Sequence, residues 1–282
     1  MKKVIFVIVG VTTMLFVVAM CVSGRSNVAS RHDVQVDGVN VVKDPDTAIP
    51  DSVINLLMVR MPDSVPQQLL VRRGYITSYN KATLLPNWVA WRLTAENVDG
   101  QWQRVKQYHE DEDVPEPRAV PEDYRGCGNM GLSRGHMCPA ADNKWDRKAI
   151  YEANALTNIC PQDRSMNSGV WNSVEMDCRK WARRYGEIYV VCGPLLLRGE
   201  HQRIGRNGVV VPEAFFKVVL CLTGKPKAFG IIVRNNDGTH KRDLYYNSVD
   251  QVERIMGMDF FAALPDDIEE AVEARLDMDE WR

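Results

Sequence analysis

The chain has 282 residues, of which 45% are hydrophobic and 26% charged, and its formal net charge is -2. This composition is typical of a globular protein and excludes collagen, a coiled coil and a wholly disordered chain. With 35 Lys and Arg against 37 Asp and Glu, bulk positive charge cannot hold a polyanion, so any such partner must be recognised by local charge.

The chain begins with an apolar segment. Lys2 and Lys3 precede a nearly unbroken apolar run over 4–22, which is typical of an export signal and just long enough to span a bilayer. We expect residues 1–24 to be a cleaved signal peptide or a retained membrane anchor, with lipidation at Cys21 as a third alternative. In each case the remainder is predicted to be exported: periplasmic, extracellular or anchored facing outward.

Residues 25–66 are polar, are broken by Pro50 and Pro62 and lack sustained periodicity, so they are expected to be a linker or loosely ordered lead-in. Residues 67–282 are expected to form one domain. An acidic stretch broken by prolines at 110–123 predicts an exposed loop. The strands predicted from short apolar runs are 74–79, 88–93, 188–192, 215–222 and 229–233.

Helices are predicted over 144–156 and 167–185 and twice near the C-terminus. The first C-terminal helix begins at Ser248, with Gln251 completing a capping-box pattern. The second follows Pro265, with acidic residues in its first turns, where the helix dipole favours them. Strands and helices are segregated along the chain, which predicts an α+β fold with a mainly antiparallel central sheet flanked by helices.

Six cysteines lie beyond Cys21, and none belongs to a C-x-x-C pair, which disfavours a zinc site built from thiolates. An even number in an exported domain predicts at least one disulfide bond. The alternative for Cys192 and Cys221, which lie in apolar runs, is a buried thiol. The six are Cys127, Cys138, Cys160, Cys178, Cys192 and Cys221.

Polar chemistry is densest in two segments, 133–137 and 167–175. The region 125–184 that contains them has ten Lys and Arg against six Asp and Glu, whereas 259–282 has nine Asp and Glu against two Arg. A positive patch within an acidic surround can focus a polyanion toward a cleft although the total charge is negative.

In the first segment, His136 could act as a base near neutral pH, and Gly135 would let the backbone approach another group closely. In the second, helical spacing would put Asn167, Trp171 and Glu175 on one stripe that continues to Arg179. Two interpretations remain open for this stripe. In one, Trp171 anchors the core and Glu175 forms a surface ion pair with Arg179. In the other, the amide oxygen of Asn167 is offered to a hard cation, and a carboxylate and a guanidinium lie behind it.

At these segments the chain resembles the DNA/RNA non-specific endonuclease family, which includes secreted sugar-non-specific nucleases and mitochondrial endonuclease G-type enzymes. The family's Asp-Arg-Gly-His hallmark appears as Ser133-Arg134-Gly135-His136. Together the similar blocks cover roughly 74–270. The further blocks lie at 156–162, 167–175, 189–195, 211–217 and 248–264.

The resemblance implies a ββα-metal (His-Me finger) motif and a Mg²⁺-dependent nuclease, with Mn²⁺ as a substitute ion and with DNA and RNA as substrates. His136 would be the general base, and Asn167 would be the direct protein ligand of the ion. Glu175 would orient water near the ion. The phosphate would be held by Arg179 and by Arg104, and Arg134 would help to shape the site.

The chain departs from the family at Ser133, which replaces the usual Asp and removes a carboxylate near the base. Two alternatives remain open, and this departure motivates the first. One is a nucleic-acid-binding protein of the same fold with weakened catalysis. The other is an exported phosphodiesterase that acts on small diesters.

Overall fold

The computed structural model describes residues 32–36, 39–236 and 242–282. The expected export segment, 1–24, lies outside the described residues. Within the described part of the chain, no helix combines the length and apolar character needed to cross a bilayer.

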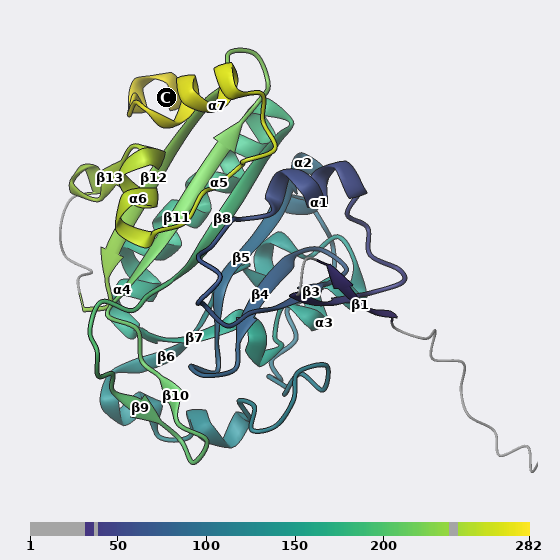
Figure 1. Ribbon diagram of the computed structural model, residues 1–282, viewed down its shortest axis with the longest axis vertical. Helices are drawn as coiled ribbons and strands as arrows, with labels where there is room; N and C mark the ends of the chain where they lie inside the picture. The colour runs from purple at the N-terminus through teal and green to yellow at the C-terminus, as the bar shows by residue number, and fades with distance from the viewer. Residues whose placement is uncertain (1–31, 37–38, 237–241) are drawn as a thin grey trace, which may run out of the picture. The chain divides into compact units, whose positions relative to one another are not determined.

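A nine-stranded sheet forms the centre of the described fold, in the order β1-β2-β3-β4-β5-β8-β11-β12-β13 (Figure 1). The β2–β3 pair is parallel, and the other described neighbours in the sheet are antiparallel. The predicted α+β fold with a mainly antiparallel sheet is therefore confirmed. The strands are β1 (His32–Val36), β2 (Val39–Lys43), β3 (Gln68–Val71), β4 (Ile76–Asn80), β5 (Leu85–Thr94), β8 (Glu187–Leu195), β11 (Ala214–Cys221), β12 (Lys227–Arg234) and β13 (Tyr246–Asn247).

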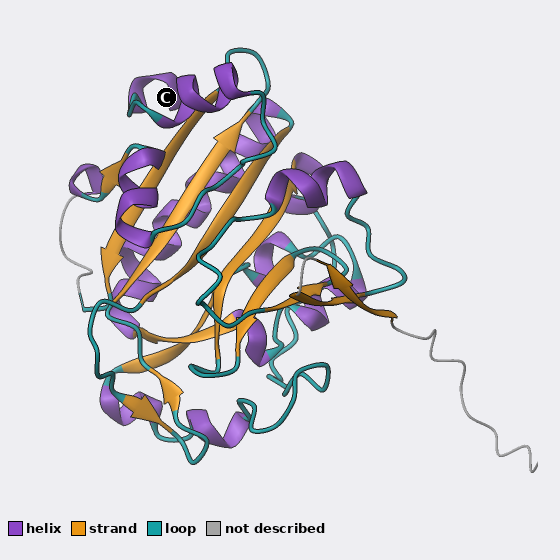
Figure 2. Ribbon diagram, viewed as in Figure 1, coloured by secondary structure: helices purple, strands orange, loops and turns teal. Residues whose placement is uncertain are grey.

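Helices cover both faces of this sheet (Figure 2). On one face, α5 buries Trp171, which precedes its first residue, and Trp181 in a first core. On the other face, α1, α6 and α7 contribute Leu57, Val252 and Val272 to a second core. The helices are α1 (Asp51–Leu57), α2 (Ala95–Val98), α3 (Arg147–Glu152), α4 (Arg164–Met166), α5 (Asn172–Tyr185), α6 (Val249–Met256) and α7 (Asp266–Glu273).

Both C-terminal helices begin where the sequence predicts. The Ser248 hydroxyl accepts a hydrogen bond from the Gln251 backbone N–H at 3.2 Å, and the Gln251 side chain accepts one from the Ser248 N–H at 2.9 Å. This reciprocal capping box starts α6. Helix α7 follows Pro265 with three acidic residues in its first turn.

The prediction of a loosely ordered lead-in over 25–66 is wrong for the residues that the structure describes. Strand β2 pairs in parallel with β3, and α1 buries Val53 and Leu57 in the second core. The backbones of Arg60 and Asp259 also pair. These short elements have no long periodic signal because tertiary pairing, rather than intrinsic propensity, stabilises them.

The predicted disulfide is also wrong for the described chain. All six described cysteines are free and buried. They lie on different elements and face the core, where burial raises the pKa of the Cys192 thiol to about 12. That thiol donates a hydrogen bond to the Met137 carbonyl at 3.2 Å. Cys192 and Cys221 are therefore buried thiols, the alternative that the sequence left open.

Candidate active site

A two-stranded antiparallel hairpin carries the first polar segment. Strand β6 (Leu132–His136) pairs with β7 (Ile159–Asp163), so that His136 lies opposite Ile159. The chain then continues through α4 and a π-helical turn, Asn167–Trp171, into α5. This strand–strand–helix arrangement is the predicted ββα motif. The hairpin strands themselves were missed in the sequence because they are short and carry more polar than apolar residues.

The helix predicted over 167–185 is not regular at its start. Gly169 has φ −94° and ψ −107°, which is not helical. The wider π turn breaks the expected i, i+4 stripe. Trp171 is therefore fully buried in the first core, as the core-anchor interpretation held, while Asn167 and Glu175 remain in contact with a cleft.

Gly135 is required by a close approach within the hairpin. A Cβ atom built on Gly135 would lie 1.7 Å from Oε1 of Gln162, which is fully buried. Any larger residue would therefore have to push the buried Gln162 side chain out of its place. The close backbone approach predicted for this glycine is confirmed.

A cleft of about 440 Å³ lies between the hairpin and the start of α5. All six residues singled out in the sequence line it, although they come from separate parts of the chain. They are Arg104, Arg134, His136, Asn167, Glu175 and Arg179.

Asn154 fixes the orientation of the His136 ring. His136 Nε2 lies 2.9 Å from Asn154 Oδ1. The Asn154 amide nitrogen donates to the backbone carbonyls of Val105, at 2.6 Å, and Gln107, at 3.1 Å, so its oxygen must face the histidine. Nε2 therefore carries the proton, and Nδ1 is free to accept one. Nothing in the sequence signals Asn154, because its partners are distant along the chain.

His136 is held neutral. Burial, with a smaller contribution from the positive charge of Arg104, lowers its pKa to about 4. An imidazole in this state is unprotonated at neutral pH, as a general base must be.

The buried histidine should make folding pH-dependent. Its folded pKa of about 4 lies below the unfolded value of about 6.5, so between these pH values the unfolded chain binds the extra proton. We expect the free energy of unfolding to fall from pH 6.5 to 4 by on the order of 3 kcal/mol through this residue. Urea unfolding at several pH values should show that His136→Gln removes this component. If the free energy of unfolding changes between pH 7 and pH 4.5 by the same amount in His136→Gln as in the wild type, the prediction is contradicted.

Ser133 orients the Asn167 amide. The Ser133 hydroxyl donates to the Gln162 carbonyl at 3.1 Å and accepts from Asn167 Nδ2 at 3.0 Å. Because the single hydroxyl proton is already used, the amide nitrogen must face the serine, which leaves Oδ1 available to a ligand. A neutral amide oxygen beside the Glu175 carboxylate is a donor set that suits a hard cation such as Mg²⁺.

Glu175 and Arg179 form part of a buried ionic network. Arg179 Nε contacts Asp142 Oδ1 at 2.7 Å, and another Arg179 nitrogen contacts Glu175 Oε2 at 3.2 Å. Asp142 also accepts a hydrogen bond from Trp91 at 3.2 Å. The Glu175 side chain is only 13% exposed, so its pairing with Arg179 is not the surface contact of the first interpretation. Burial raises the pKa of both carboxyl groups.

Two further arginines approach the cleft from the hairpin and from the segment before the acidic loop. The Arg134 guanidinium lies 5.1 Å from the ring centroid of Tyr108. An exposed Arg104 nitrogen donates to the Tyr108 hydroxyl at 3.3 Å. Tyr108 also lies beside His136, with 5.6 Å between the ring centroids. One tyrosine thus organises two cations around the histidine.

A fully buried lysine lies beneath the cleft. Lys217 Nζ is 4.5 Å from the centroid of Trp171 and 5.3 Å from that of Trp91, and it has no hydrogen-bond partner among the described residues. Burial disfavours its charge, but surrounding groups, including Cys192 and Glu175, raise its pKa above the usual value. Two indole faces and nearby carboxylates therefore hold an ammonium that sequence reasoning did not find.

Replacing Lys217 by methionine should destabilise the fold by about 3 kcal/mol or more, because Asp142 and Glu175 would keep their buried negative charges with one cation fewer. Lys225→Met is the matched control. Lys225 is 68% exposed, and its loss should change the free energy of unfolding by less than about 1 kcal/mol. Urea denaturation measures both variants. If Lys217→Met and Lys225→Met had equal free energies of unfolding, the Lys217 ammonium would not be balancing the negative charges of Asp142 and Glu175.

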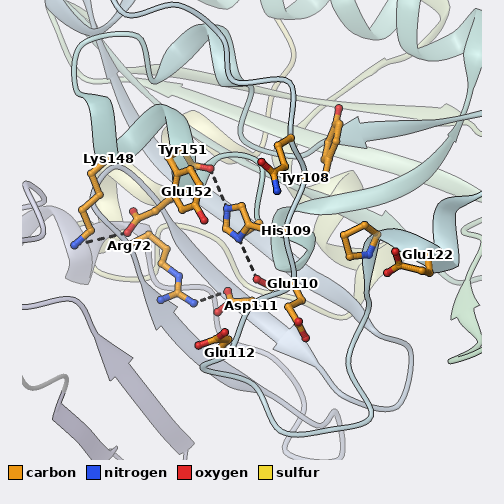
Figure 3. Close-up of a pocket in the computed structure, with 13 residues that line it drawn as sticks. Arg72, Tyr108, His109, Glu110, Asp111, Glu112, Glu122, Lys148, Tyr151 and Glu152 are labelled. Carbon is orange, nitrogen blue, oxygen red and sulfur yellow. Dashed lines mark hydrogen bonds and ion pairs between the residues drawn. The ribbon is translucent and has the colours of Figure 1, made fainter. Parts of the chain in front are cut away.

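A larger pocket of about 710 Å³ adjoins this region (Figure 3). In it His109 stacks on Tyr151, with 4.3 Å between the ring centroids, and contacts the Glu110 carbonyl at 3.0 Å. Arg72 is paired with Asp111. The pocket wall is rich in carboxylates, and none of the catalytic candidates lines it, so the smaller cleft is the better candidate for chemistry on a polyanion.

The sequence matches the family model described as DNA/RNA non-specific endonuclease over residues 54–267. It is 35% identical to the mitochondrial nuclease EXOG of Homo sapiens over 209 residues, which cover 68% of this chain and 56% of that protein. A nuclease of Nostoc sp. is 29% identical over 251 residues, covering 81% and 88%. A crystal structure of the EndoG/EndoGI complex superposes with a TM-score of 0.66 at 28% identity, covering 71% of this chain and 88% of that one.

The matched region spans little more than half the length of the human relative. What that whole protein does therefore bears on this chain only through the shared domain and its cleft.

Proposed function

This chain belongs to the DNA/RNA non-specific endonuclease family, and from that premise we propose that it is a Mg²⁺-dependent endonuclease that hydrolyses DNA and RNA with little sequence preference. The observation that carries the proposal is the single cleft in which a neutral His136 faces the Asn167 amide and the Glu175 carboxylate. The relatives named nucleases support the same reaction class.

His136 supplies the base. Its Nδ1 accepts the proton of the attacking water while Nε2 remains bonded to Asn154. The low pKa of about 4 keeps this nitrogen free at neutral pH. Proton transfer by a positioned group contributes roughly 10²–10⁴-fold to rate.

Asn167 would hold the ion through Oδ1, and Glu175 would orient the water around it. When bound, Mg²⁺ would offset the negative charge that builds on the phosphate and on the leaving oxygen. Ser133 keeps the amide oriented, so the serine that replaces the family's usual Asp retains a positioning role. This arrangement favours catalysis over the alternative of a binding protein with weakened activity.

Arg104, Arg134 and Arg179 supply positive charge around the cleft. Because these groups would contact phosphate rather than base edges, little sequence preference is expected. The family chemistry would leave 5′-phosphate and 3′-hydroxyl ends. We extend the proposal to export, on the ground of the basic start and the apolar run over 4–22.

The test is a nuclease assay on the purified chain, with plasmid DNA and single-stranded RNA as substrates. Both should be cut with Mg²⁺ or Mn²⁺ and spared with EDTA. Binding without cutting at saturating Mg²⁺ would favour the binding protein. Turnover of a small diester as fast as that of a long duplex would favour a small-diester phosphodiesterase, because the positive cleft should prefer the polymer.

A further inference from the structure

Three carboxylates converge between α6 and α7. These two helices pack on the face of the sheet opposite to α5 (Figure 1), and α5 lines the catalytic cleft. One ligand atom each from Asp250, Glu253 and Glu273 lies within 4.8 Å of the other two. Asp250 and Glu253 lie on α6, and Glu273 is the last residue of α7. The cluster therefore joins two helices that meet near the C-terminus.

Glu273 makes this more than a group of surface acids. Its residue exposure is 6%, and its Oε1 atom has no hydrogen-bond partner among the described residues. A buried carboxylate oxygen without a partner is costly. A carboxylate oxygen of Glu273 lies within 4.8 Å of an oxygen of each of the other two carboxylates, and these cannot donate a hydrogen bond to it while ionised.

The protein's own cations do not satisfy the cluster within the described residues. Arg254 reaches Asp250 only at 4.0 Å and is itself 69% exposed. Arg60 is paired with Asp259, at 3.3 Å. Burial and the neighbouring acids Glu253, Glu269, Asp259 and Asp250 raise the pKa of Glu273 to about 9, which expresses the same unbalanced negative charge.

The geometry points to a binding site for a divalent cation, Ca²⁺, held by Asp250, Glu253 and Glu273. Oxygen ligands without histidine or thiolate select a hard ion. The three ligand atoms lie no more than 4.8 Å from one another, so a small inward shift of the side chains brings all three within the Ca–O distance of about 2.3–2.6 Å of one ion. Mg²⁺ binds at about 2.1 Å and keeps several waters, so it fits three converging carboxylates less well.

The ion would fasten α7 to α6 and so stabilise the C-terminal part of the domain. Glu253 can take part without losing its existing contact, because one of its oxygens, Oε1, accepts the Phe260 backbone N–H at 2.8 Å and the other remains available. Neither helix contributes a residue to the catalytic cleft. The site is therefore separate from the chemistry proposed above and does not depend on it.

The experiment compares thermal unfolding of the chelator-treated full chain with and without CaCl₂. With Ca²⁺ at about 100 times its Kd, the wild-type Tm should rise by on the order of 5 °C. Glu273→Gln should abolish this rise. Glu270→Gln removes an exposed acid of the same helix and should respond like the wild type.

Calorimetric titration with Ca²⁺, in chains that also carry Asn167→Ala to remove the catalytic ion, should give one ion per chain and none after Glu273→Gln. If Glu273→Gln fails to fold, Glu253→Gln replaces it, because that side chain is less buried. A wild-type Tm that Ca²⁺ leaves unchanged, as expected if Glu273 is simply protonated, would overturn the site. Nuclease activity of Glu273→Gln in Mg²⁺ at 25 °C should equal that of the wild type, so failure of this site is distinguishable from failure of the proposed function.

Discussion

His136→Ala is expected to lower kcat/KM for plasmid cleavage by roughly 10³-fold, within the range of general-base catalysis. In the proposed mechanism the imidazole is the neutral proton acceptor, and Asn154 fixes its ring through a contact of 2.9 Å. Alanine removes the acceptor but leaves the hairpin register and Gly135 in place. The measurement is the initial rate of conversion of supercoiled to nicked plasmid in Mg²⁺.

His109→Ala is the matched control for this variant. His109 lies in the neighbouring pocket, stacked on Tyr151 (Figure 3), and does not line the catalytic cleft. It should retain nearly full activity. Full activity in a folded His136→Ala protein, as judged by circular dichroism, would remove His136 from the role of base.

Asn167→Ala should weaken Mg²⁺ binding by on the order of 100-fold or more, because changes that only disturb the support of a metal ligand already cause about 10–100-fold losses. Cleavage should fall sharply at low Mg²⁺ and recover in part at high Mg²⁺. Calorimetry in the absence of substrate measures the affinity, and the dependence of rate on Mg²⁺ concentration gives a second readout.

Two variants separate ligation from positioning. Ser133→Ala keeps the amide oxygen but removes the hydroxyl that the Asn167 amide contacts at 3.0 Å, so it should cost about 10-fold in metal affinity. Asn167→Asp restores an oxygen and should rescue binding relative to alanine. Unchanged affinity in Asn167→Ala would exclude this residue as the ligand.

The central strands could be predicted because their apolar runs are buried on both faces of the sheet. Strand β11, over Ala214–Cys221, is buried at every position and stands out in the sequence. Strand β2 and helix α1 do not, because they depend on pairing with β3 and on the second core. A sequence pattern therefore predicts only those elements whose own residues show the periodicity or apolar run, and not those that tertiary contacts stabilise.

The candidate catalytic residues other than Arg104 could be proposed from the sequence because they lie in two short polar segments, and because these segments resemble a known family. The residues that support them could not. Asn154 lies 18 positions from His136, and Lys217 is on a distant strand among apolar neighbours. Their significance comes from contacts that form only when the sheet and the hairpin are assembled. A lysine in an apolar run is a visible anomaly, but the sequence does not say what surrounds it.

The six buried thiols determine how this domain responds to oxidants. No disulfide bond links the described residues, so a reducing agent should not change the free energy of unfolding of the native state. Oxidants would act mainly on the unfolded chain, in which all the thiols are accessible at once and can form non-native disulfide bonds. The rate at which a thiol reagent labels these cysteines would therefore report how often the core opens. If the chain does fold in an oxidising compartment, rapid burial of the cysteines is what would protect it from cross-linking.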